Sequence, residues 1–509
     1  MEGSAPPHFE ENNKRAGSCS LVIFGATGDL TGRKLMPAIY HLGRDGLLPP
    51  HFACVGFARR TKTDEQFRKE MRCSVEKHAQ TQPLDSSFWE HFSQSLFYHT
   101  SQFDDDEGYR SLKALLTKLD RERGTEGSRI FYLSVQPKFF PLITSKLKEH
   151  GMIVDFRRDS LPFSRVIIEK PFGRDSSSAH ELQKHLEQSL HEEQIYRIDH
   201  YLGKETVQNI LVFRFANAIF ESLWNNRHID HVQITVAESI GIGTRGKFFE
   251  EQGIVRDVIQ NHMIQLLSLT AMEPPANLSP IAIRGEKVKV LECLRPLEGK
   301  DLSECLIRGQ YAPGFIDGKS VPGYREEADV SPHSTMETFC SLRIFIDNWR
   351  WAGVPFYLRA GKRLPKRGTE IAVVFKDAPG ILFKEQGSNP SNVLAIRIQP
   401  DEGISMRINC KVPGPESPIQ PVKMDFRYGS YFGKAPPEAY ERLIWDCMVG
   451  DSTLFAGTNE EEHSWKFFTP ILDHFEEQPS EQFFLYDSGS WGPAQADALL
   501  QGGRSWRLL

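Results

Sequence analysis

Residues Arg197–Glu205 place a carboxylate, an imidazole, a phenol and an ammonium within nine positions. Such a set suits a small anionic molecule that also carries hydroxyl groups. The following segment, residues 206–216, has apolar residues at near-helical spacing, so His200, Tyr201 and Lys204 are predicted to lie at the N-terminal end of a helix. Helix starts attract phosphate through free backbone N–H groups and the helix dipole. A solvated polar loop ahead of a core helix is the alternative for this segment taken alone.

A second chemical motif lies in a predicted helix over residues 253–271, where Arg256–His262 is embedded among Ile, Val, Met and Leu. Asp257 and His262 are five positions apart, so an ideal α-helix does not place them on one stripe. Tertiary structure would have to bring them together. A hydrogen-bonded core histidine is the alternative interpretation of His262.

Length and composition limit the class of protein. A chain of 509 residues predicts about three domains, or two with one unusually large. Its net charge of -6 gives no support for nucleic-acid or acidic-membrane binding, and no run approaches a membrane span. The N-terminus lacks the apolar core of a signal peptide. Eight cysteines without a C-x-x-C pair give no zinc or redox motif and favour a reducing cytoplasm. We therefore expect a cytoplasmic protein with no nucleic-acid or membrane partner.

From residue 20 onwards, short β-rich runs alternate with helical patterns, which is typical of βαβ units that form a parallel sheet. The predicted strands are residues 21–24, 52–58, 95–98, 130–134, 166–168 and 195–198, and the predicted helices are residues 34–42, 65–78, 109–120, 137–149 and 178–190.

The first predicted strand runs directly into a glycine-containing turn, Gly25–Leu30. Such a turn lets the backbone approach a pyrophosphate and points a helix start at it. The spacing is G-x-x-G, with Gly32 further on, and not the standard G-x-G-x-x-G. The second strand ends in Arg59-Arg60, where an NAD site would have an acidic residue, so the sequence favours NADP with its 2'-phosphate over NAD.

The strand at residues 166–168 ends in Glu169–Gly173. Ligands of open α/β sheets bind outside the carboxyl ends of the strands, so Lys170 is expected to point toward cofactor and substrate. An ordinary surface turn is the alternative for this Lys-Pro segment.

The second half of the chain has a different pattern. Long alternating runs without intervening helices predict a large, mainly antiparallel sheet; they are residues 338–346, 356–359, 371–375, 393–398, 404–412 and 424–428, followed by helices near 437–449 and 460–477. A sheet face free of helices is a natural subunit contact, so we expect a homodimer or homotetramer. The predicted fold class is an α/β Rossmann-like N-terminal domain plus an α+β C-terminal domain. The predicted boundaries are a flexible tail at 1–19, an NADP-binding domain at 20–200, and a substrate and oligomerisation domain at 201–509.

Four motifs occur in an order that resembles the glucose-6-phosphate dehydrogenase family: Gly25–Leu30, Glu169–Gly173, Arg197–Glu205 and Arg256–His262. The resemblance extends from about residue 20 to near the C-terminus and includes Leu358–Lys362 and Ala439–Leu443. It implies oxidation of glucose 6-phosphate to 6-phosphoglucono-δ-lactone with reduction of NADP, the first step of the pentose phosphate pathway.

The resemblance also implies residue roles. His262 matches the general base and Asp199 the carboxylate paired with it, which agrees with a reaction in which the C1 hydroxyl loses a proton as hydride leaves C1. No metal is expected. The residues that match substrate-binding positions are Lys170, His200, Tyr201, Lys204, Glu238, Asp257, Lys362 and Arg367. Those that match cofactor-binding positions are Gly25, Ala26, Thr27, Gly28, Asp29, Leu30, Lys34, Arg59 and Lys170, with Thr27 and Arg59 at the 2'-phosphate.

Some positions depart from the family pattern. The loop after Glu238 lacks a proline that some relatives carry, and residue 367 is arginine where lysine is frequent. Mammalian members hold a second, structural NADP near the C-terminal sheet, and Trp506 is a partial match that leaves this site open. Two other functions are alternatives: a related sugar dehydrogenase acting on a non-phosphorylated sugar, and a catalytically inactive NADP-binding sensor.

Overall fold

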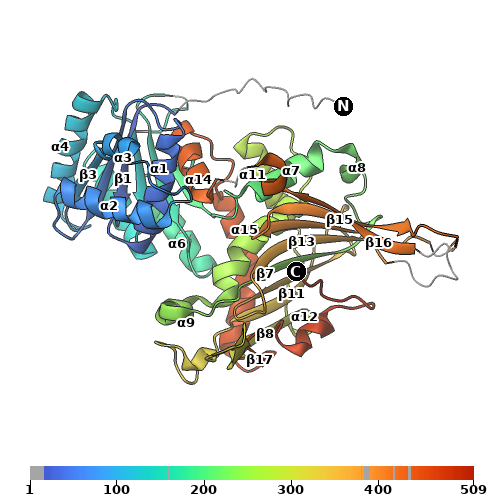
Figure 1. Ribbon diagram of the computed structural model, residues 1–509. Coiled ribbons are helices and arrows are strands. Elements are labelled where there is room, and N and C mark those ends of the chain that lie inside the picture. The colour runs from blue at the N-terminus through green and yellow to red at the C-terminus, as the bar shows by residue number, and fades with distance from the viewer. Residues whose placement is uncertain (1–15, 159, 380, 383–389, 416–418, 434–436) are drawn as a thin grey trace, which may run out of the picture. The chain divides into compact units, whose positions relative to one another are not determined.

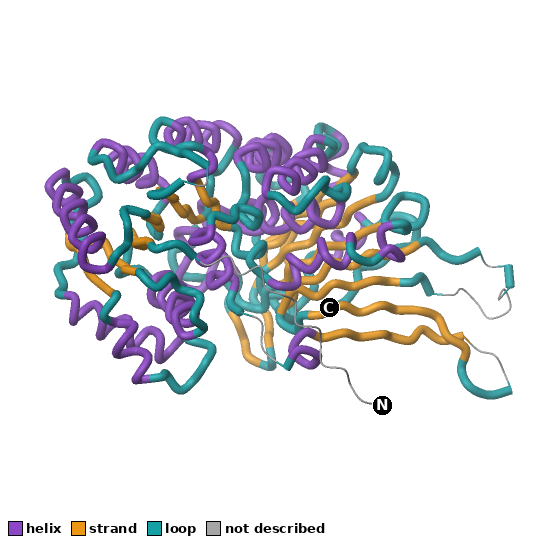
Figure 2. The backbone as a smooth tube through the Cα atoms, turned by 90° about the horizontal axis from the view of Figure 1, so that it is seen from above, coloured by secondary structure: helices purple, strands orange, loops and turns teal. Residues whose placement is uncertain are grey.

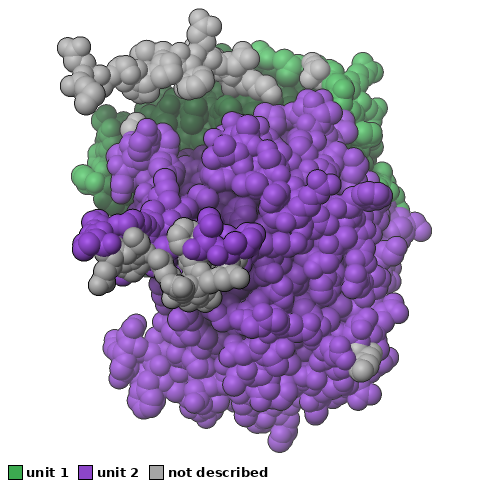
Figure 3. All heavy atoms as spheres, turned by 90° about the vertical axis from the view of Figure 1, so that its right-hand side faces the viewer, with its two compact units in different colours: residues 1–169, 185–198, 440–454 green, residues 170–184, 199–439, 455–509 purple. Residues whose placement is uncertain are grey.

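The computed structural model of the chain describes residues 16–158, 160–379, 381–382, 390–415, 419–433 and 437–509. The chain forms two compact units (Figure 3), of which the first comprises residues 1–169, 185–198 and 440–454 and the second residues 170–184, 199–439 and 455–509. The domain boundaries expected from the sequence stay a prediction, and residues 1–15 of the expected tail lie outside the described residues. No helix within the described ranges combines the length and the apolar character needed to cross a membrane.

A six-stranded parallel sheet forms the centre of the first unit, and Figure 1 labels its strands β1 and β3. The strand order is β3-β2-β1-β4-β5-β6. β1, β2 and β4 are buried along their whole length, as expected for parallel strands covered on both faces. The strands are β1 (Cys19–Phe24), β2 (Phe52–Ala58), β3 (Leu96–Thr100), β4 (Arg129–Leu133), β5 (Ser164–Glu169) and β6 (Ile195–Ile198). This order is that of a doubly wound dinucleotide-binding fold, which confirms the predicted Rossmann-like class.

The helices between these strands have recognisable start and stop signals. α2 begins after Thr63, which forms a capping box with Gln66, and α4 begins after Asp105 and ends at Gly124 in the left-handed conformation. The short α3 was missed by the sequence analysis. The helical segments between β1 and β6 in the chain are η1 (Thr31–Leu35, a π-helix), α1 (Met36–Arg44), α2 (Asp64–His78), α3 (Ser86–Ser93), α4 (Asp106–Arg123), η2 (Pro137–Phe139), α5 (Phe140–Glu149), α6 (Ser176–Glu187) and η3 (Glu192–Gln194). Residues 176–184 of α6 belong to the second unit.

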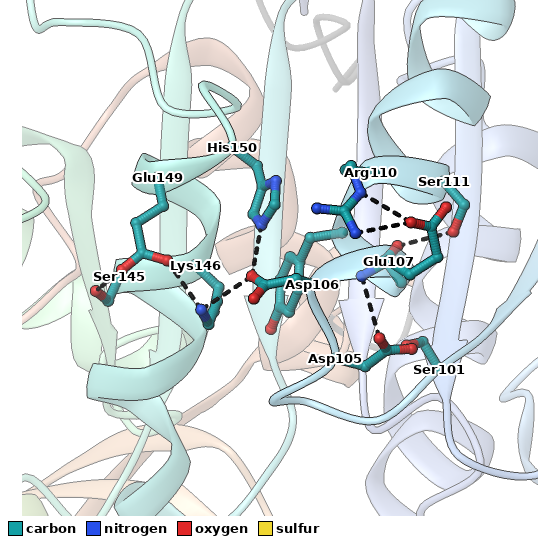
Figure 4. A network of polar contacts seen from close by, with 12 residues as sticks. Ser101, Asp105, Asp106, Glu107, Arg110, Ser111, Ser145, Lys146, Glu149 and His150 are labelled. Atoms are coloured by element: carbon teal, nitrogen blue, oxygen red, sulfur yellow. Dashed lines mark hydrogen bonds and ion pairs between the residues drawn. The ribbon is translucent and has the colours of Figure 1, made fainter.

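A polar network joins the start of α4 to the end of α5 (Figure 4). Lys146 Nζ lies 2.9 Å from both Asp106 Oδ1 and Glu149 Oε2, and His150 Nε2 lies 2.9 Å from the same Asp106 oxygen. Hydrogen bonds from His150 and Lys146 lower the pKa of Asp106. Asp106, Glu149 and His150 are also spaced like metal ligands. Because the Lys146 ammonium already bonds both carboxylates, we interpret the network as an ion-pair link between two helices.

A helix from the far end of the chain belongs to the first unit. α14 (Ala439–Val449) contacts α1 through a buried pair in which His41 Nδ1 lies 2.7 Å from Glu441 Oε1. Arg165 in β5 donates a 2.6 Å hydrogen bond to the carbonyl of Cys447. The helix itself was predicted from its pattern, but its place in the first unit was not.

A nine-stranded mixed sheet dominates the second unit, in the order β16-β15-β14-β13-β7-β12-β11-β8-β17. β7 pairs parallel with β12 and β8 with β17, while all other neighbours are antiparallel, which confirms the prediction of a mainly antiparallel sheet. Figure 2 shows these strands lying side by side. They are β7 (Ile229–Ala237), β8 (Leu306–Ala312), β11 (Phe339–Phe345), β12 (Pro355–Gly361), β13 (Gly368–Phe375), β14 (Val393–Gln399), β15 (Gly403–Lys411), β16 (Ile419–Arg427) and β17 (Phe483–Asp487), with the separate hairpin β9 (Gly314–Ile316) and β10 (Lys319–Val321). β7, β8 and β17 were not predicted.

The helices of the second unit include the predicted helix over residues 253–271. It consists of a short π-helix, η5 (Val255–Met263), followed by α10 (Ile264–Ala271), and η5 packs against β7 and β12. The other helical segments are α7 (Glu205–Phe215), α8 (Ala218–Glu221), η4 (Gly243–Arg245), α9 (Gly246–Ile254), α11 (Pro280–Glu292), α12 (Lys300–Cys305), η6 (Tyr324–Glu326), α13 (Tyr428–Phe432), α15 (Thr458–Glu477) and η8 (Ala494–Leu499).

Candidate active site

The imidazole of His262, in η5, is the centre of the candidate site and is bonded at both ring nitrogens. Its Nδ1 lies 2.6 Å from Asp199 Oδ1, and its Nε2 lies 2.9 Å from Lys170 Nζ. A lysine ammonium has three donor hydrogens and no acceptor, so it bonds Nε2 only if that nitrogen carries a free lone pair. The ring proton is therefore on Nδ1, which donates it to Asp199. Nε2 is left as the basic nitrogen.

Burial is the main reason that this ring stays neutral. Burial lowers the pKa of His262 and the Lys170 ammonium lowers it further, whereas Asp199 opposes both effects. Burial raises the pKa of Asp199, but His262 and the backbone N–H of Tyr201 favour its ionised form more strongly, so this pKa lies below its usual range. A neutral imidazole beside an ionised carboxylate is the state in which a general base can accept a proton near neutral pH.

The π-helical geometry of η5 places Asp257 on the same side as His262. A π-helix bonds residue i to residue i+5, so residues five apart lie about one turn apart. Lys170 Nζ contacts both residues, since it also lies 2.5 Å from the carbonyl of Asp257 and 3.2 Å from its Oδ1. Our expectation that tertiary structure alone would have to bring the two side chains together was therefore wrong, because the local backbone is not an ideal α-helix.

Asp257 is held as a carboxylate by its neighbours. Burial raises its pKa, but the charges of Lys170 and Lys362 and the hydrogen bond from Lys170 lower it more, so that the pKa lies below the usual range. A charged carboxylate at this place can accept hydrogen bonds from hydroxyl groups.

Residues of the segment Arg197–Glu205 lie beside the His262 ring. The ring of Tyr201 stacks on that of His262 at 4.4 Å between centroids, and the ring of His200 lies edge-on to His262 at 4.5 Å. Lys204 occupies the N-cap position of α7, as the sequence predicted, and its Nζ lies 5.5 Å from the centre of the Tyr201 ring. Two polar rings thus lie against the candidate base, and the Lys204 ammonium at the helix start lies beside one of them, the Tyr201 ring.

Two further residues of this group were missed by the sequence analysis. Gln399 Oε1 accepts a 3.0 Å hydrogen bond from Lys204 Nζ, and the Tyr201 hydroxyl lies 3.2 Å from Thr369 Oγ1. Thr369 and Gln399 are register partners on β13 and β14. No local signal marks either residue, because only the pairing of these strands brings them to Tyr201.

Arg367 is exposed and lies two positions before Thr369. Burial raises the pKa of Tyr201, while the Thr369 hydrogen bond and the Arg367 guanidinium act in the opposite direction. The predicted cation at residue 367 therefore acts electrostatically on the Tyr201 hydroxyl, although its planar guanidinium differs from a lysine ammonium in geometry.

Another ion pair lies where two parallel strands end. Glu238 follows β7 and Lys362 follows β12, and the strand ends Ala237 and Gly361 are register partners. Lys362 Nζ lies 2.5 Å from Glu238 Oε2. The loop after Glu238, whose shape the sequence left open, is bonded to the other strand end, where Arg363 N donates to the carbonyl of Ile240 at 3.2 Å.

Asp199, His200 and His262 also offer three ligand atoms within 4.8 Å of one another. The Lys170 ammonium already lies 2.9 Å from His262 Nε2, so a metal cation there would face a like charge. The donor set is better suited to proton transfer than to holding a metal.

The glycine-rich turn of the first unit has the geometry of a phosphate-binding turn. Gly25 has φ of +84°, and a Cβ added there would lie 2.1 Å from the carbonyl oxygen of Ser134, so glycine is required. The chain turns from β1 into η1 through this segment, and Arg59 is exposed directly after β2. A cavity of about 610 Å³ lies against the turn, a size suited to a small-molecule ligand. It is lined by Ala26, Thr27, Gly28, Asp29, Gly32, Arg33, Lys69, Glu70, Met71, Cys73, Ser74 and His78. These residues fit a dinucleotide, and Lys34 lies exposed on η1.

A doubly wound sheet with this turn, and a second unit with a histidine base beside cationic side chains, define the class of nicotinamide-dependent dehydrogenases. Residues 22–209 match the family model described as "Glucose-6-phosphate dehydrogenase, NAD binding domain". Residues 211–507 match the model described as "Glucose-6-phosphate dehydrogenase, C-terminal domain". The chain therefore belongs to the glucose-6-phosphate dehydrogenase family, as the motifs predicted.

Curated relatives are similar over nearly their whole length. The "Glucose-6-phosphate 1-dehydrogenase" of Chlamydia pneumoniae is 53% identical over 497 residues, which cover 96% of each chain. The "Glucose-6-phosphate 1-dehydrogenase 2" of Mycobacterium tuberculosis is 46% identical over 508 residues, covering 98% of this chain and 97% of the relative. A solved structure described as "Glucose-6-phosphate dehydrogenase in complex with its substrate glucose-6-phosphate" is 36% identical, with a TM-score of 0.88 and coverage of 97% and 99% of the two chains.

The contact between Lys170 and His262 makes a prediction that needs no substrate. Lys170→Met removes a positive charge next to Nε2, so we expect the pKa of His262 to rise toward its ordinary range. The pKa is measured by NMR titration of histidine labelled with ¹³C at Cε1, and the His262 signal is assigned by its loss in His262→Asn. Lys289→Met, which removes an exposed lysine paired with Glu286 in α11, is the matched control and should leave this pKa unchanged. An unchanged or lower pKa in Lys170→Met would contradict the assigned tautomer and charge.

Proposed function

We propose that this chain oxidises D-glucose 6-phosphate at C1 to 6-phospho-D-glucono-1,5-lactone and reduces NADP⁺ to NADPH, the first step of the oxidative pentose phosphate pathway. The observation that carries the proposal is the neutral His262 imidazole, oriented by Asp199 and placed beside a group of cationic and polar side chains at the start of α7. The similarity of the chain to family members over almost its full length supports the same reaction.

In the proposed reaction His262 Nε2 removes the proton from the C1 hydroxyl. The C1–H bond breaks with both of its electrons, and the C1–O bond becomes the carbonyl of the lactone. When bound, the nicotinamide ring accepts this hydride. Asp199 holds the ring of His262 in the tautomer that exposes Nε2 and stabilises the imidazolium that forms. Lys170, which bonds Nε2 in this structure, has to give way to the C1 hydroxyl.

The phosphate of the substrate is assigned to the group at α7. His200, Tyr201 and Lys204 would bind it together with the helix start, because an ammonium and free backbone N–H groups both favour a dianion. Arg367, Thr369 and Gln399 lie around the same group and would complete its walls. Lys204 now bonds Gln399 and would exchange this neutral partner for a phosphate oxygen.

The sugar hydroxyls are assigned to the remaining polar side chains. The carboxyl groups of Glu238 and Asp257 are hydrogen-bond acceptors, and Lys362, which bonds Glu238, is a donor. Lys170 contacts both Asp257 and His262 and would be a residue shared by substrate and coenzyme.

The coenzyme is assigned to the first unit. The backbone of Gly25, Ala26, Gly28, Asp29 and Leu30 would bind the pyrophosphate, and Lys34 adds a positive charge nearby. Thr27 and Arg59 would bind the 2'-phosphate that distinguishes NADP from NAD, because a guanidinium suits a phosphate dianion and no acidic residue follows β2.

We also propose that two or more copies of the chain associate through β16. This strand is one edge of the nine-stranded sheet and presents unpaired backbone groups to a partner. Its exposed side chains Val422 and Met424 continue into exposed Tyr431 and Phe432 in α13, whose rings pack around Phe426. An apolar edge of this kind suits a second copy related by a two-fold axis, in a cytoplasmic homodimer or homotetramer.

The proposed base is tested by His262→Asn. The variant keeps a polar side chain of similar size but cannot take up the proton of the C1 hydroxyl, so we expect kcat to fall by about 10²-fold or more with little change in glucose 6-phosphate affinity. Turnover is followed by NADPH absorbance and affinity by calorimetry, with glucose as the comparison substrate. Undiminished turnover would remove His262 from the chemistry.

The proposed 2'-phosphate site is tested by Arg59→Ala. Removing this cation takes away a charge-assisted bond that only NADP can form, so kcat/KM with NADP should fall by about tenfold or more while the value with NAD changes little. Arg60→Ala, at the neighbouring exposed arginine, is the comparison variant. Equal losses with both coenzymes in Arg59→Ala would contradict the assignment.

The proposed association of two copies through β16 is tested by analytical sedimentation of the Met424→Glu variant. Each chain has a mass of 58.0 kDa, and a charge placed on the apolar edge should shift the assembly toward this monomer mass. Leu485→Glu on β17, the opposite edge of the sheet, is a matched control because Leu485 is 60% exposed and Met424 is 59% exposed. A wild-type monomer, or an assembly broken only by the control, would refute the contact.

A further inference from the structure

We infer that Glu337 is a positioning residue for the reaction: it fixes the start of the helix that carries Asp257 and His262, next to the strand end that presents Lys362. The inference rests on the proposed function. Glu337 lies just before β11, at a place where the sequence shows no catalytic motif.

Glu337 bonds the first turn of η5 twice. Its backbone carbonyl accepts a 3.0 Å hydrogen bond from Ile254 N, and its Oε1 accepts a 3.2 Å hydrogen bond from Val255 N. The first N–H groups of a helix have no partners inside the helix, so partners from elsewhere decide where the helix begins. Here one residue from a different part of the chain supplies both.

The backbone at the start of η5 fits this contact closely. Gly253 has φ of +62° and ψ of 179°. This conformation interrupts α9, and residues other than glycine rarely adopt it. A Cβ built on Gly253 would lie 2.2 Å from Glu337 Oε1. The Glu337 carboxylate therefore fills the space that only a glycine at residue 253 leaves open.

Residues 337–338 are linked by hydrogen bonds both to the helix that bears His262 and to the strand end that bears Lys362. Asp257 lies in the first turn of η5, and its carbonyl and carboxylate bond Lys170, which in turn bonds His262 Nε2. On the other side, the carbonyl of Thr338 accepts a 3.0 Å hydrogen bond from Lys362 N. Residues 337–338 thus hold both the base helix and the strand end that bears Lys362.

The side chain of Glu337 acts through its acceptor oxygen. It is only 3% exposed. Burial raises the pKa of Glu337, whereas Arg256 in η5 and Arg308 in β8 lower it. The Glu337 carboxylate in turn raises the pKa of Cys340 in β11 and of Tyr324 in η6. A carboxylic acid and an amide can both accept a hydrogen bond from Val255 N. Glutamine should therefore preserve the helix start, whereas alanine should release it.

The test compares Glu337→Ala with Glu337→Gln in glucose 6-phosphate oxidation. Loss of the buried acceptor in Glu337→Ala should lower kcat by about tenfold, because a helix whose start is released misplaces His262 and Asp257 relative to the substrate. Because Lys170 then loosens from His262, the pKa of His262 should rise and the acid limb of the kcat/KM profile should move to higher pH. Glu337→Gln should keep both kcat and the acid limb near the wild-type values.

Two further variants keep the test decisive. Glu326→Ala removes a glutamate that caps the neighbouring turn η6 through Gly323 N, without contacting η5, and should leave the acid limb in place. Gly253→Ala places a Cβ where the Glu337 carboxylate lies and should reproduce the shift of the acid limb. This variant replaces Glu337→Ala in the test if Glu337→Ala does not fold. An acid limb that stays in place in Gly253→Ala and in every folded Glu337 variant would overturn the inference, as would an equal loss in alanine and glutamine. Absence of wild-type turnover would instead refute the proposed function.

Discussion

The hydrogen bond from the Lys170 ammonium to His262 Nε2 is the contact on which the chemistry of the second unit depends. An ammonium can only donate, so the contact requires a neutral ring with its proton on Nδ1, and Asp199 accepts that proton at 2.6 Å. Burial and the positive charge of Lys170 keep the ring neutral, while the carboxylate is ready to stabilise the cation formed on proton uptake. A satisfied core histidine, the alternative for this residue, would need no such carboxylate and ammonium at opposite nitrogens.

The fold brings these groups together through features that are unfavourable by themselves. The π-helix η5 has poorer hydrogen-bond geometry than an α-helix, yet its i→i+5 bonding aligns Asp257 with His262 so that one lysine contacts both. Its start follows a glycine that breaks α9 and is held by a buried glutamate. Parallel pairing of β7 with β12 brings Glu238 and Lys362 to one edge of the sheet. Local strain of this kind is frequent at functional sites, where the surrounding structure stabilises it.

Much of the fold was predictable from local pattern. The continuous apolar runs predicted the strands of the parallel sheet, and the alternating runs after residue 334 predicted β11 to β16. β7 was not predicted although it lies in the middle of the second sheet, and the place of α14 in the first unit depends on contacts such as His41 with Glu441 that no local pattern records. The site was predictable where residues form contiguous motifs. Thr369, Gln399 and Glu337 were missed because strand pairing and helix capping, not neighbours in sequence, give them their positions.

The most direct test of the account is the single-turnover transfer of deuterium from [1-²H]glucose 6-phosphate to NADP⁺, measured as a function of pH. If His262 removes the proton of the C1 hydroxyl, the rate in the wild type should fall on the acid side with one ionisation, because the protonated ring cannot act as a base. That ionisation should be absent from the much slower transfer in His262→Asn. The same acid limb in the variant would show that another group carries the proton and would contradict the central role of His262.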